Sequence, residues 1–269
     1  HIMPDIVSDI TYIVRQKEKP YYESSALTGM VPKLHFKTET RKVLIKDIRD
    51  SKNFSLIKNG FVFKKIKFNL NEKDIQNNYT QYKRDLSKFI KELFPYKYID
   101  IFDITRRSNE KAGASNKDGP RQPAERAHVD YTNSSGLVRA KKILRNKFSE
   151  FRKYRVIQLN VWRPLCSKVL SSPLAIADAS TISQKDLIET DQVFPDRIGE
   201  IYHLAYERKQ KWYWVSEMRN NEALIFKGWD SDTSNKVVKF TPHTSFNIPD
   251  QKINKHPRQS VEARIFIVL

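Results

Sequence analysis

The sequence predicts an α+β fold in which a jelly-roll barrel is supported by helices. Three observations predict it: helical apolar patterns occur only in the first part of the chain, short strand-like segments dominate the later part, and no internal repeat is present. Short strands that follow one another after a helical part are typical of a sheet structure with helices packed against it.

The chain is long enough for one large domain. With 269 residues, 39% hydrophobic and 12% aromatic, it has the material for a hydrophobic core and lacks the composition of a disordered protein. We therefore expect a single domain over residues 1–269. It divides into an N-terminal arm (1–45), N-terminal strands with a buttress helix (46–97), and the jelly-roll core (98–269).

Residues 4–45 show little periodicity and are expected to form an irregular arm. From residue 42 to residue 68, apolar residues alternate with polar ones, which predicts strands. The pair Asn59-Gly60 interrupts this pattern and predicts a turn between them.

Two amphipathic helices are expected. Asn71 is a suitable N-cap with Asp74 three residues later, and the helix ends before Pro95. Its apolar residues recur every three or four positions: Ile75, Tyr79, Tyr82, Leu86, Phe89, Ile90 and Leu93. The same spacing predicts a second helix with the apolar residues Leu137, Ala140, Leu144, Phe148 and Phe151.

The remaining segments are read as strands and loops. The polar loop 108–123 contains two glycines and is either a lid or a plain surface loop. Strands are expected at 98–105, 155–165, 200–216 and 222–228, and in the segments that carry His243 and Arg258. Trp212 and Trp214 share one strand face, where core packing is the expected role.

The formal net charge of +18 raises the question of nucleic-acid binding. The basic residues are spread along the chain, which is typical of solvated helix faces and turns, so specific nucleic-acid binding is disfavoured. A basic mouth that attracts an anionic or carrier-linked small molecule fits better. Cys166 is the only cysteine, so no internal disulfide forms and a reducing, cytoplasmic setting is expected. No run of about 18 apolar residues is present, so no membrane span is expected.

His128-Val129-Asp130 and the later His243 predict a metal site. On a strand, residues two apart point to the same face, so His128 and Asp130 can reach one point. A histidine from a distant strand completes two nitrogens and one oxygen, the arrangement with which non-haem Fe(II) oxygenases leave positions open for O2 and substrate. A His-x-Asp pair also occurs by chance, and His203, which alternates with apolar residues, is expected to be a packed strand residue.

Arg258 and Ser260 follow His243 on a predicted strand. A guanidinium there presents a fork that matches the carboxylate of a 2-oxo acid cosubstrate, and Ser260 could donate a hydroxyl to it. Arg264 keeps the same strand phase and competes with Arg258 as the anchor, and a surface salt bridge is the structural alternative. Arg163 in an apolar strand is expected either to bind a carboxylate of the substrate or cosubstrate or to pair with an internal acid such as Asp178.

Arg107 and Tyr131, which flank the predicted ligand segment, are further candidates for the substrate pocket.

Ordered blocks of the chain resemble the cephamycin 7-methoxylase and gibberellin desaturase-like oxygenases. The segment Asn160-Val161-Trp162-Arg163-Pro164-Leu165 is similar to their N-x-W-R-P-L strand, and 257–264 is similar to their P-R-E-S-I-E-x-R ending. The resemblance covers roughly residues 45–269 and includes these further blocks: 59–61, 106–108, 121–123, 128–132, 173–178, 212–214, 222–231 and 242–246.

The resemblance implies a double-stranded β-helix of the cupin-like type, with Fe(II), 2-oxoglutarate and O2. The expected reactions are hydroxylation, desaturation or oxidative cyclisation of a small molecule in specialised-metabolite biosynthesis. Gln259 departs from the family's usual Glu, and some relatives of this branch close rings without consuming 2-oxoglutarate. Two other classes stay open: a basic module for nucleic acid or another anionic polymer on a non-catalytic barrel, and a zinc hydrolase that uses the same three ligands.

Overall fold

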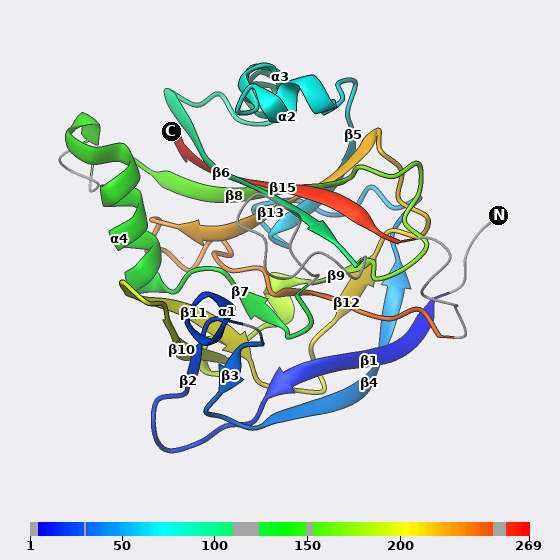
Figure 1. The fold of residues 1–269 in the computed structure, drawn as a ribbon, viewed down its shortest axis with the longest axis vertical. Helices are drawn as coiled ribbons and strands as arrows, with labels where there is room; N and C mark the ends of the chain where they lie inside the picture. The colour runs from blue at the N-terminus through cyan, green and yellow to red at the C-terminus, as the bar shows by residue number, and fades with distance from the viewer. Residues whose placement is uncertain (1–4, 30, 110–123, 149–152, 250–256) are drawn as a thin grey trace.

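The computed structural model describes residues 5–29, 31–109, 124–148, 153–249 and 257–269. Two β-sheets face each other and enclose most of the core (Figure 1). The ten-stranded sheet has the order β1 (Ile6–Ile13), β4 (Thr38–Asp47), β12 (Trp212–Trp214), β9 (Leu174–Ala177), β14 (His243–Ser245), β7 (His128–Val129), β11 (Ile198–Leu204), β10 (Leu187–Val193), β2 (Tyr21–Glu23) and β3 (Lys33–Leu34). The five-stranded sheet has the order β5 (Phe61–Lys65), β13 (Glu222–Asp230), β8 (Val156–Pro164), β15 (Gln259–Val268) and β6 (Tyr98–Ser108).

Strands β8 and β15 carry apolar residues on one face and both polar and apolar residues on the other. Odd-numbered residues such as Leu159 and Ile265 pack under helix α3 (Thr80–Leu93), against its buried Tyr82 and Leu86. Figure 1 shows this helix above the outer face of the five-stranded sheet. Because side chains alternate along a strand, the even-numbered residues of β8 and β15 face the interior between the sheets. The polar residues of these two strands therefore point to the region where a site can form.

The predicted buttress helix is two helices, α2 (Glu72–Gln76) and α3. The side chain of Asn71 accepts a hydrogen bond from Asp74 N at 2.9 Å, which confirms the predicted cap. The chain then breaks, because Asn78 and Tyr79 adopt positive φ angles of 54° and 61°. The carboxylate of Asp74 accepts from the backbone of Gln81 and Tyr82, so it satisfies the free N–H groups at the start of α3.

The second predicted helix begins earlier and ends sooner than its apolar spacing indicates. It is α4 (Asn133–Leu144), capped by a Thr132–Ser135 capping box and followed by the 3₁₀ turn η1 (Arg145–Phe148). Its buried residues are Gly136, Ala140 and Leu144. The predicted apolar position at 151 lies outside the described residues, as does the predicted lid over 110–123.

The expectation of an irregular arm over residues 1–45 is wrong for its described part. Strand β1 pairs in antiparallel register with β4, from Ile6 opposite Ile45 to Ile13 opposite Thr38. Every second residue from Ile6 to Tyr12 is buried, whereas the intervening Val7 and Asp9 are exposed. The short helix α1 (Ser25–Thr28) follows β2. The ten-stranded sheet therefore includes strands that precede residue 98, where the jelly-roll core was predicted to begin.

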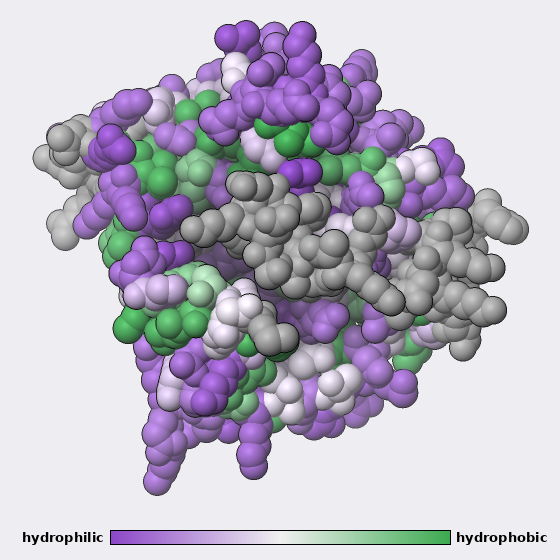
Figure 2. Space-filling model, in the orientation of Figure 1, coloured by the Kyte–Doolittle hydropathy of each residue, from purple (hydrophilic) through white to green (hydrophobic). Residues whose placement is uncertain are grey.

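The surface is predominantly hydrophilic on the face seen in Figure 2, with hydrophobic residues in scattered patches.

The 3₁₀ turns η2 (Ala179–Thr181) and η3 (Gln184–Asp186) lie between β9 and β10. Within the described ranges, no helix is long and apolar enough to cross a membrane.

Candidate metal centre

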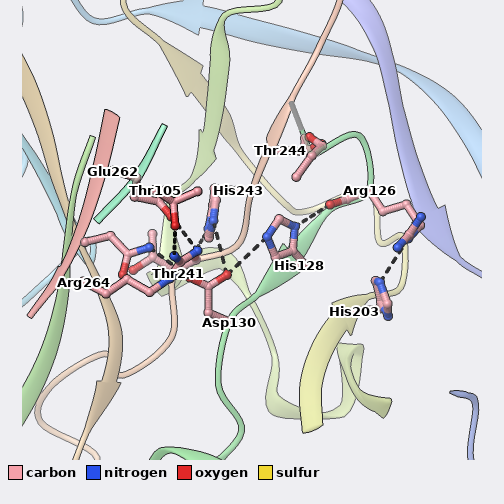
Figure 3. A network of polar contacts seen from close by, with 12 residues as sticks. Thr105, Arg126, His128, Asp130, His203, Thr241, His243, Thr244, Glu262 and Arg264 are labelled. Carbon is pink, nitrogen blue, oxygen red and sulfur yellow. Dashed lines mark hydrogen bonds and ion pairs between the residues drawn. The ribbon is translucent and has the colours of Figure 1, made fainter. Parts of the chain in front are cut away.

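The three predicted ligands come together on the inner side of the ten-stranded sheet. Strand β7 carries His128 and lies between β14 and β11, with His243 directly opposite His128 in the register. The two imidazole rings lie 4.5 Å apart between centroids. Asp130 follows β7 immediately, so the His-x-Asp spacing brings its carboxylate to the same place (Figure 3).

Both histidines are oriented by backbone carbonyls two residues upstream. Nδ1 of His128 lies 2.6 Å from the carbonyl oxygen of Arg126, and Nδ1 of His243 lies 3.2 Å from that of Thr241. A carbonyl only accepts, so each Nδ1 carries the proton and each Nε2 keeps its lone pair. The Nε2 atoms lie 3.3 Å (His128) and 3.9 Å (His243) from Oδ1 of Asp130.

Burial keeps His243 in the state that binds a metal. Desolvation, together with the neighbouring His128, lowers the pKa of His243 to about 3, although Asp130 acts in the opposite direction. The imidazole is therefore neutral at physiological pH and offers an unprotonated Nε2. Phe226 of β13 packs against it, with 4.6 Å between ring centroids, and shields it from water.

Asp130 is held from the opposite sheet. Its Oδ2 accepts from Nδ2 of Asn160 on β8 at 3.1 Å and from Nε of Arg264 on β15 at 2.8 Å. Burial alone would raise the pKa of Asp130, but Arg264 and the two imidazoles outweigh it and hold that pKa well below its usual value. The carboxylate is therefore ionised, with Oδ2 occupied and Oδ1 turned toward the histidines.

The donor set fits a divalent iron ion. The ligand atoms of His128, Asp130 and His243 lie within 4.8 Å of one another, as the ligands around one metal ion must. Two imidazole nitrogens and one carboxylate oxygen on one side leave the other coordination positions open, the arrangement of non-haem Fe(II) oxygenases. A structural zinc site would use four protein ligands, and the residues that the structure describes supply three here.

A pocket beside the three ligands contains unpaired polar groups. Arg107, Trp162, Arg258, Glu262 and Arg264 line it together with His128 and His243. Among the described residues, Nε of Arg258 and Oγ of Ser260 are buried without a hydrogen-bond partner, while one Nη of Arg258 donates to the carbonyl of Ser172 at 2.6 Å. Burial, with Arg107 adding to it, lowers the pKa of Arg258 to about 9. A buried cation of this kind needs a neighbouring anion to offset the free energy of its desolvation.

The predicted arginines occupy different positions relative to the pocket. Arg107, Arg258 and Arg264 all line the pocket, and Arg264 in addition contacts Asp130 directly. The prediction that Arg163 binds substrate or pairs with Asp178 is wrong. Arg163 points to the outer face of β8, toward the rings of Phe68 and Tyr82, and donates to the carbonyl of Asn220.

Tyr131 packs at the edge of the core between the sheets and is not a pocket-lining residue among those described. His203 is a buried strand residue, as predicted: Nδ1 contacts Oγ1 of Thr190 at 3.1 Å and Nε2 accepts from Nε of Arg126 at 3.3 Å.

Sequence reasoning missed Asn160 and Glu262. Asn160 lies in the apolar strand β8 and contacts Asp130, and Glu262 lies two residues from both Ser260 and Arg264 on β15. For Glu262 the available signal was its strand phase with Ser260 and Arg264, and for Asn160 it was a polar residue in an otherwise apolar strand.

Comparisons with known proteins agree with this geometry. Residues 10–268 match the family described as "Oxidoreductase/YMDC permease-like domain". The chain belongs to this family. A relative from Aspergillus novofumigatus, the Fe(II)/2-oxoglutarate-dependent dioxygenase nvfI, is 26% identical over 261 residues, which cover 93% of this chain and 91% of that protein. The hydroxylase/desaturase CTB9 of Cercospora beticola is 26% identical over 287 residues, covering 93% of this chain and 87% of that protein.

A solved structure shows the same fold. The chain superimposes on the iron and alpha-ketoglutarate-dependent endoperoxidase NvfI with a TM-score of 0.84 and 24% identity, over 98% of both chains. This likeness confirms the predicted jelly-roll fold.

Proposed function

We propose that the protein is an Fe(II)- and 2-oxoglutarate-dependent dioxygenase that hydroxylates, desaturates or oxidatively cyclises a small molecule in specialised-metabolite biosynthesis. The observation that carries the proposal is the convergence of Nε2 of His128, Nε2 of His243 and Oδ1 of Asp130 at one point. The enzyme class and cofactors agree with the names of relatives that align with about nine-tenths of the chain.

His128, Asp130 and His243 would hold the iron. The bound iron supplies the activation of O2 and the removal of hydrogen from an unactivated C–H bond. The chain's own groups prepare the site: the backbone carbonyls of Arg126 and Thr241 accept from Nδ1 of each imidazole, so that the neutral ring presents Nε2 to the metal position. Phe226 and Trp162 exclude water from the two sides of the site that they cover.

Arg258 and Ser260 are the proposed anchor of the distal carboxylate of 2-oxoglutarate. Nε of Arg258 and Oγ of Ser260 are buried polar atoms with no partner in the described part of the chain, and the Arg258 guanidinium lies 5.5 Å from the ring centroid of Trp162. An incoming carboxylate would satisfy both atoms and neutralise a buried cation. Arg107 lines the same pocket and adds positive charge for an acidic ligand.

The substrate is proposed to be anionic or carried on an acidic carrier, because the chain has a net charge of +18. The block resemblance to the cephamycin 7-methoxylase and gibberellin desaturase-like oxygenases supports a place near that branch. The cytoplasm is the proposed compartment, on the strength of the single cysteine, Cys166.

Anaerobic addition of Fe(II) and 2-oxoglutarate to the metal-free protein tests the function. A weak visible charge-transfer band and one iron per chain are expected, and His128→Ala, Asp130→Ala and His243→Ala should each remove the band and the turnover. Failure to bind iron stoichiometrically would sink the proposal. Iron binding without a band would favour the relatives that dispense with 2-oxoglutarate, and copurified zinc with oxygen-independent hydrolysis would identify a hydrolase.

A further inference from the structure

Asp130 presents only one of its two oxygens to the metal position. Oδ1 faces the two histidines, whereas Oδ2 accepts from Asn160 and Arg264 (Figure 3). A carboxylate with both oxygens free can rotate or bind a metal through both oxygens. The two donors on Oδ2 oppose both movements, because each would break at least one hydrogen bond to a charged acceptor.

Arg264 is itself fixed on every side. Its Nε donates to Asp130, one Nη lies 2.6 Å from Oδ2 of Asp103, and the other lies 2.7 Å from Oε1 of Glu262. The Arg264 side chain is 14% exposed. All three nitrogens of its fork therefore already meet carboxylates. Arg264 differs in this from Arg258, whose Nε has no partner among the residues that the structure describes.

We propose that Arg264 is a positioning residue that keeps Asp130 bound to the metal through a single oxygen, and that it does not anchor the cosubstrate. The proposal rests on the proposed iron site. Asp103 and Glu262 fix the guanidinium, Arg264 and Asn160 fix Oδ2, and Oδ1 remains as the one carboxylate ligand. A carboxylate that bound through both oxygens would leave two positions for 2-oxoglutarate and would occupy the one that O2 needs.

The test is a Co(II) titration of the metal-free protein, because Co(II) reports both affinity and coordination number through its visible spectrum. Arg264→Lys keeps the charge but loses the fork. The expected result is a Kd for Co(II) weaker by about 10–100-fold and a changed visible spectrum. The Kd of 2-oxoglutarate, measured at saturating Co(II), should stay within about threefold of the wild-type value.

Two further variants keep the test decisive. Asp103→Asn alters the outer end of the network at a side chain that is 38% exposed, so it is expected to fold even if Arg264→Lys does not. It should weaken Co(II) binding in the same direction but less. Arg155→Lys is the matched control: Arg155 makes a comparable two-nitrogen contact with Asp230, which does not line the pocket, and Co(II) binding should be unchanged.

Each alternative outcome of these titrations leads to a different conclusion. Unchanged Co(II) binding in both Arg264→Lys and Asp103→Asn would overturn the proposal. Loss of 2-oxoglutarate affinity with intact Co(II) binding in Arg264→Lys would also overturn it and make Arg264 the anchor. If the wild-type protein binds no metal, the proposed function fails first, independently of Arg264.

Discussion

At the scale of single residues, two equally buried arginines are expected to respond differently to substitution. Arg258 and Arg163 are each 1% exposed, yet Arg258 faces the pocket and Arg163 faces the rings under α3. Neighbouring side chains on a strand point to opposite faces, so Arg163 and the pocket-lining Trp162 are necessarily separated.

Arg258→Gln is expected to weaken 2-oxoglutarate binding and leave iron binding intact. Losing one partner of a buried charge pair typically costs about 2–5 kcal/mol, roughly 30- to 4000-fold in Kd. Titration of 2-oxoglutarate into the iron-loaded, oxygen-free protein measures it.

Arg163→Gln is the control for this experiment. It should lower the free energy of unfolding and leave the Kd of 2-oxoglutarate unchanged. Equal losses of 2-oxoglutarate affinity in the two variants would contradict the assignment of Arg258 as the anchor.

The metal ligands could be predicted from the sequence because their geometry is local. The His-x-Asp spacing fixes two ligands on one strand face, and chain order proposed the third. Asn160 and Arg163 could not be sorted in the same way. Strand β8 is buried on both faces, so its apolar pattern does not show which side faces the site.

At the scale of elements, helix α4 depends on a glycine for its contact with β13. A Cβ at Gly136 would lie 2.2 Å from Cδ1 of Trp229, whose Nε1 donates to the carbonyl of Asn133 at 3.2 Å. Trp229 also packs edge-on against Phe266 of β15, two residues after Arg264. The glycine therefore sets how closely α4 approaches the five-stranded sheet.

Gly136→Ala should lower the free energy of unfolding by about 1–3 kcal/mol, because overpacking outweighs the better helix propensity of alanine. Urea denaturation of the metal-free protein measures the change. Ser134→Ala, at an exposed position of the same helix, is the control and should differ little from wild type. A Gly136→Ala protein as stable as this control would show that α4 can move away from Trp229 at no cost.

Helix boundaries were less predictable than helix existence. The apolar spacing from Ile75 to Leu93 continues through the break at Asn78 and Tyr79, so the pattern alone indicated one helix. The break is stabilised by Asp74 of α2, whose backbone N–H donates to the Asn71 cap and whose buried carboxylate accepts from the backbone at the start of α3. Such a role depends on three-dimensional contacts that no spacing rule contains.

At the scale of the whole molecule, the N-terminal strands show the limit of sequence patterns. Strand β1 pairs with residues 38–45 of β4, and β4 exposes most of its side chains, so β4 does not have the apolar density of a core strand. Their pairing also supports the site, because the carbonyl of Thr11 accepts a hydrogen bond from Ala127 N, next to His128.

Acid should destabilise the whole fold through a histidine outside the ligand set. Burial, followed by the charges of Arg126 and His128, holds the pKa of His203 well below its ordinary value of 6.5. Below pH 6.5 the unfolded chain takes up a proton at this residue and the folded chain does not, so stability falls as the pH falls. The contribution approaches about 1.4 kcal/mol for each pH unit.

Urea denaturation with a chelator present, between pH 7.5 and 5, measures this dependence. His203→Gln should reduce the slope and leave the part that His243 contributes, whereas His35→Gln, at a partly exposed histidine, is the control. An identical pH dependence in His203→Gln and wild type would rule out His203 as the source.

The orienting contacts of the three ligands differ in how they tolerate sequence drift. His128 and His243 are aligned by main-chain oxygens of residues 126 and 241, which every amino acid supplies, so substitutions there need not disturb the imidazoles. Asp130 is aligned by the side chains of Asn160 and Arg264. Descendants of this chain can therefore change positions 126 and 241 and keep the histidine geometry, whereas a change at 160 or 264 alters the carboxylate. Variation at those two positions is where new metal reactivity would arise.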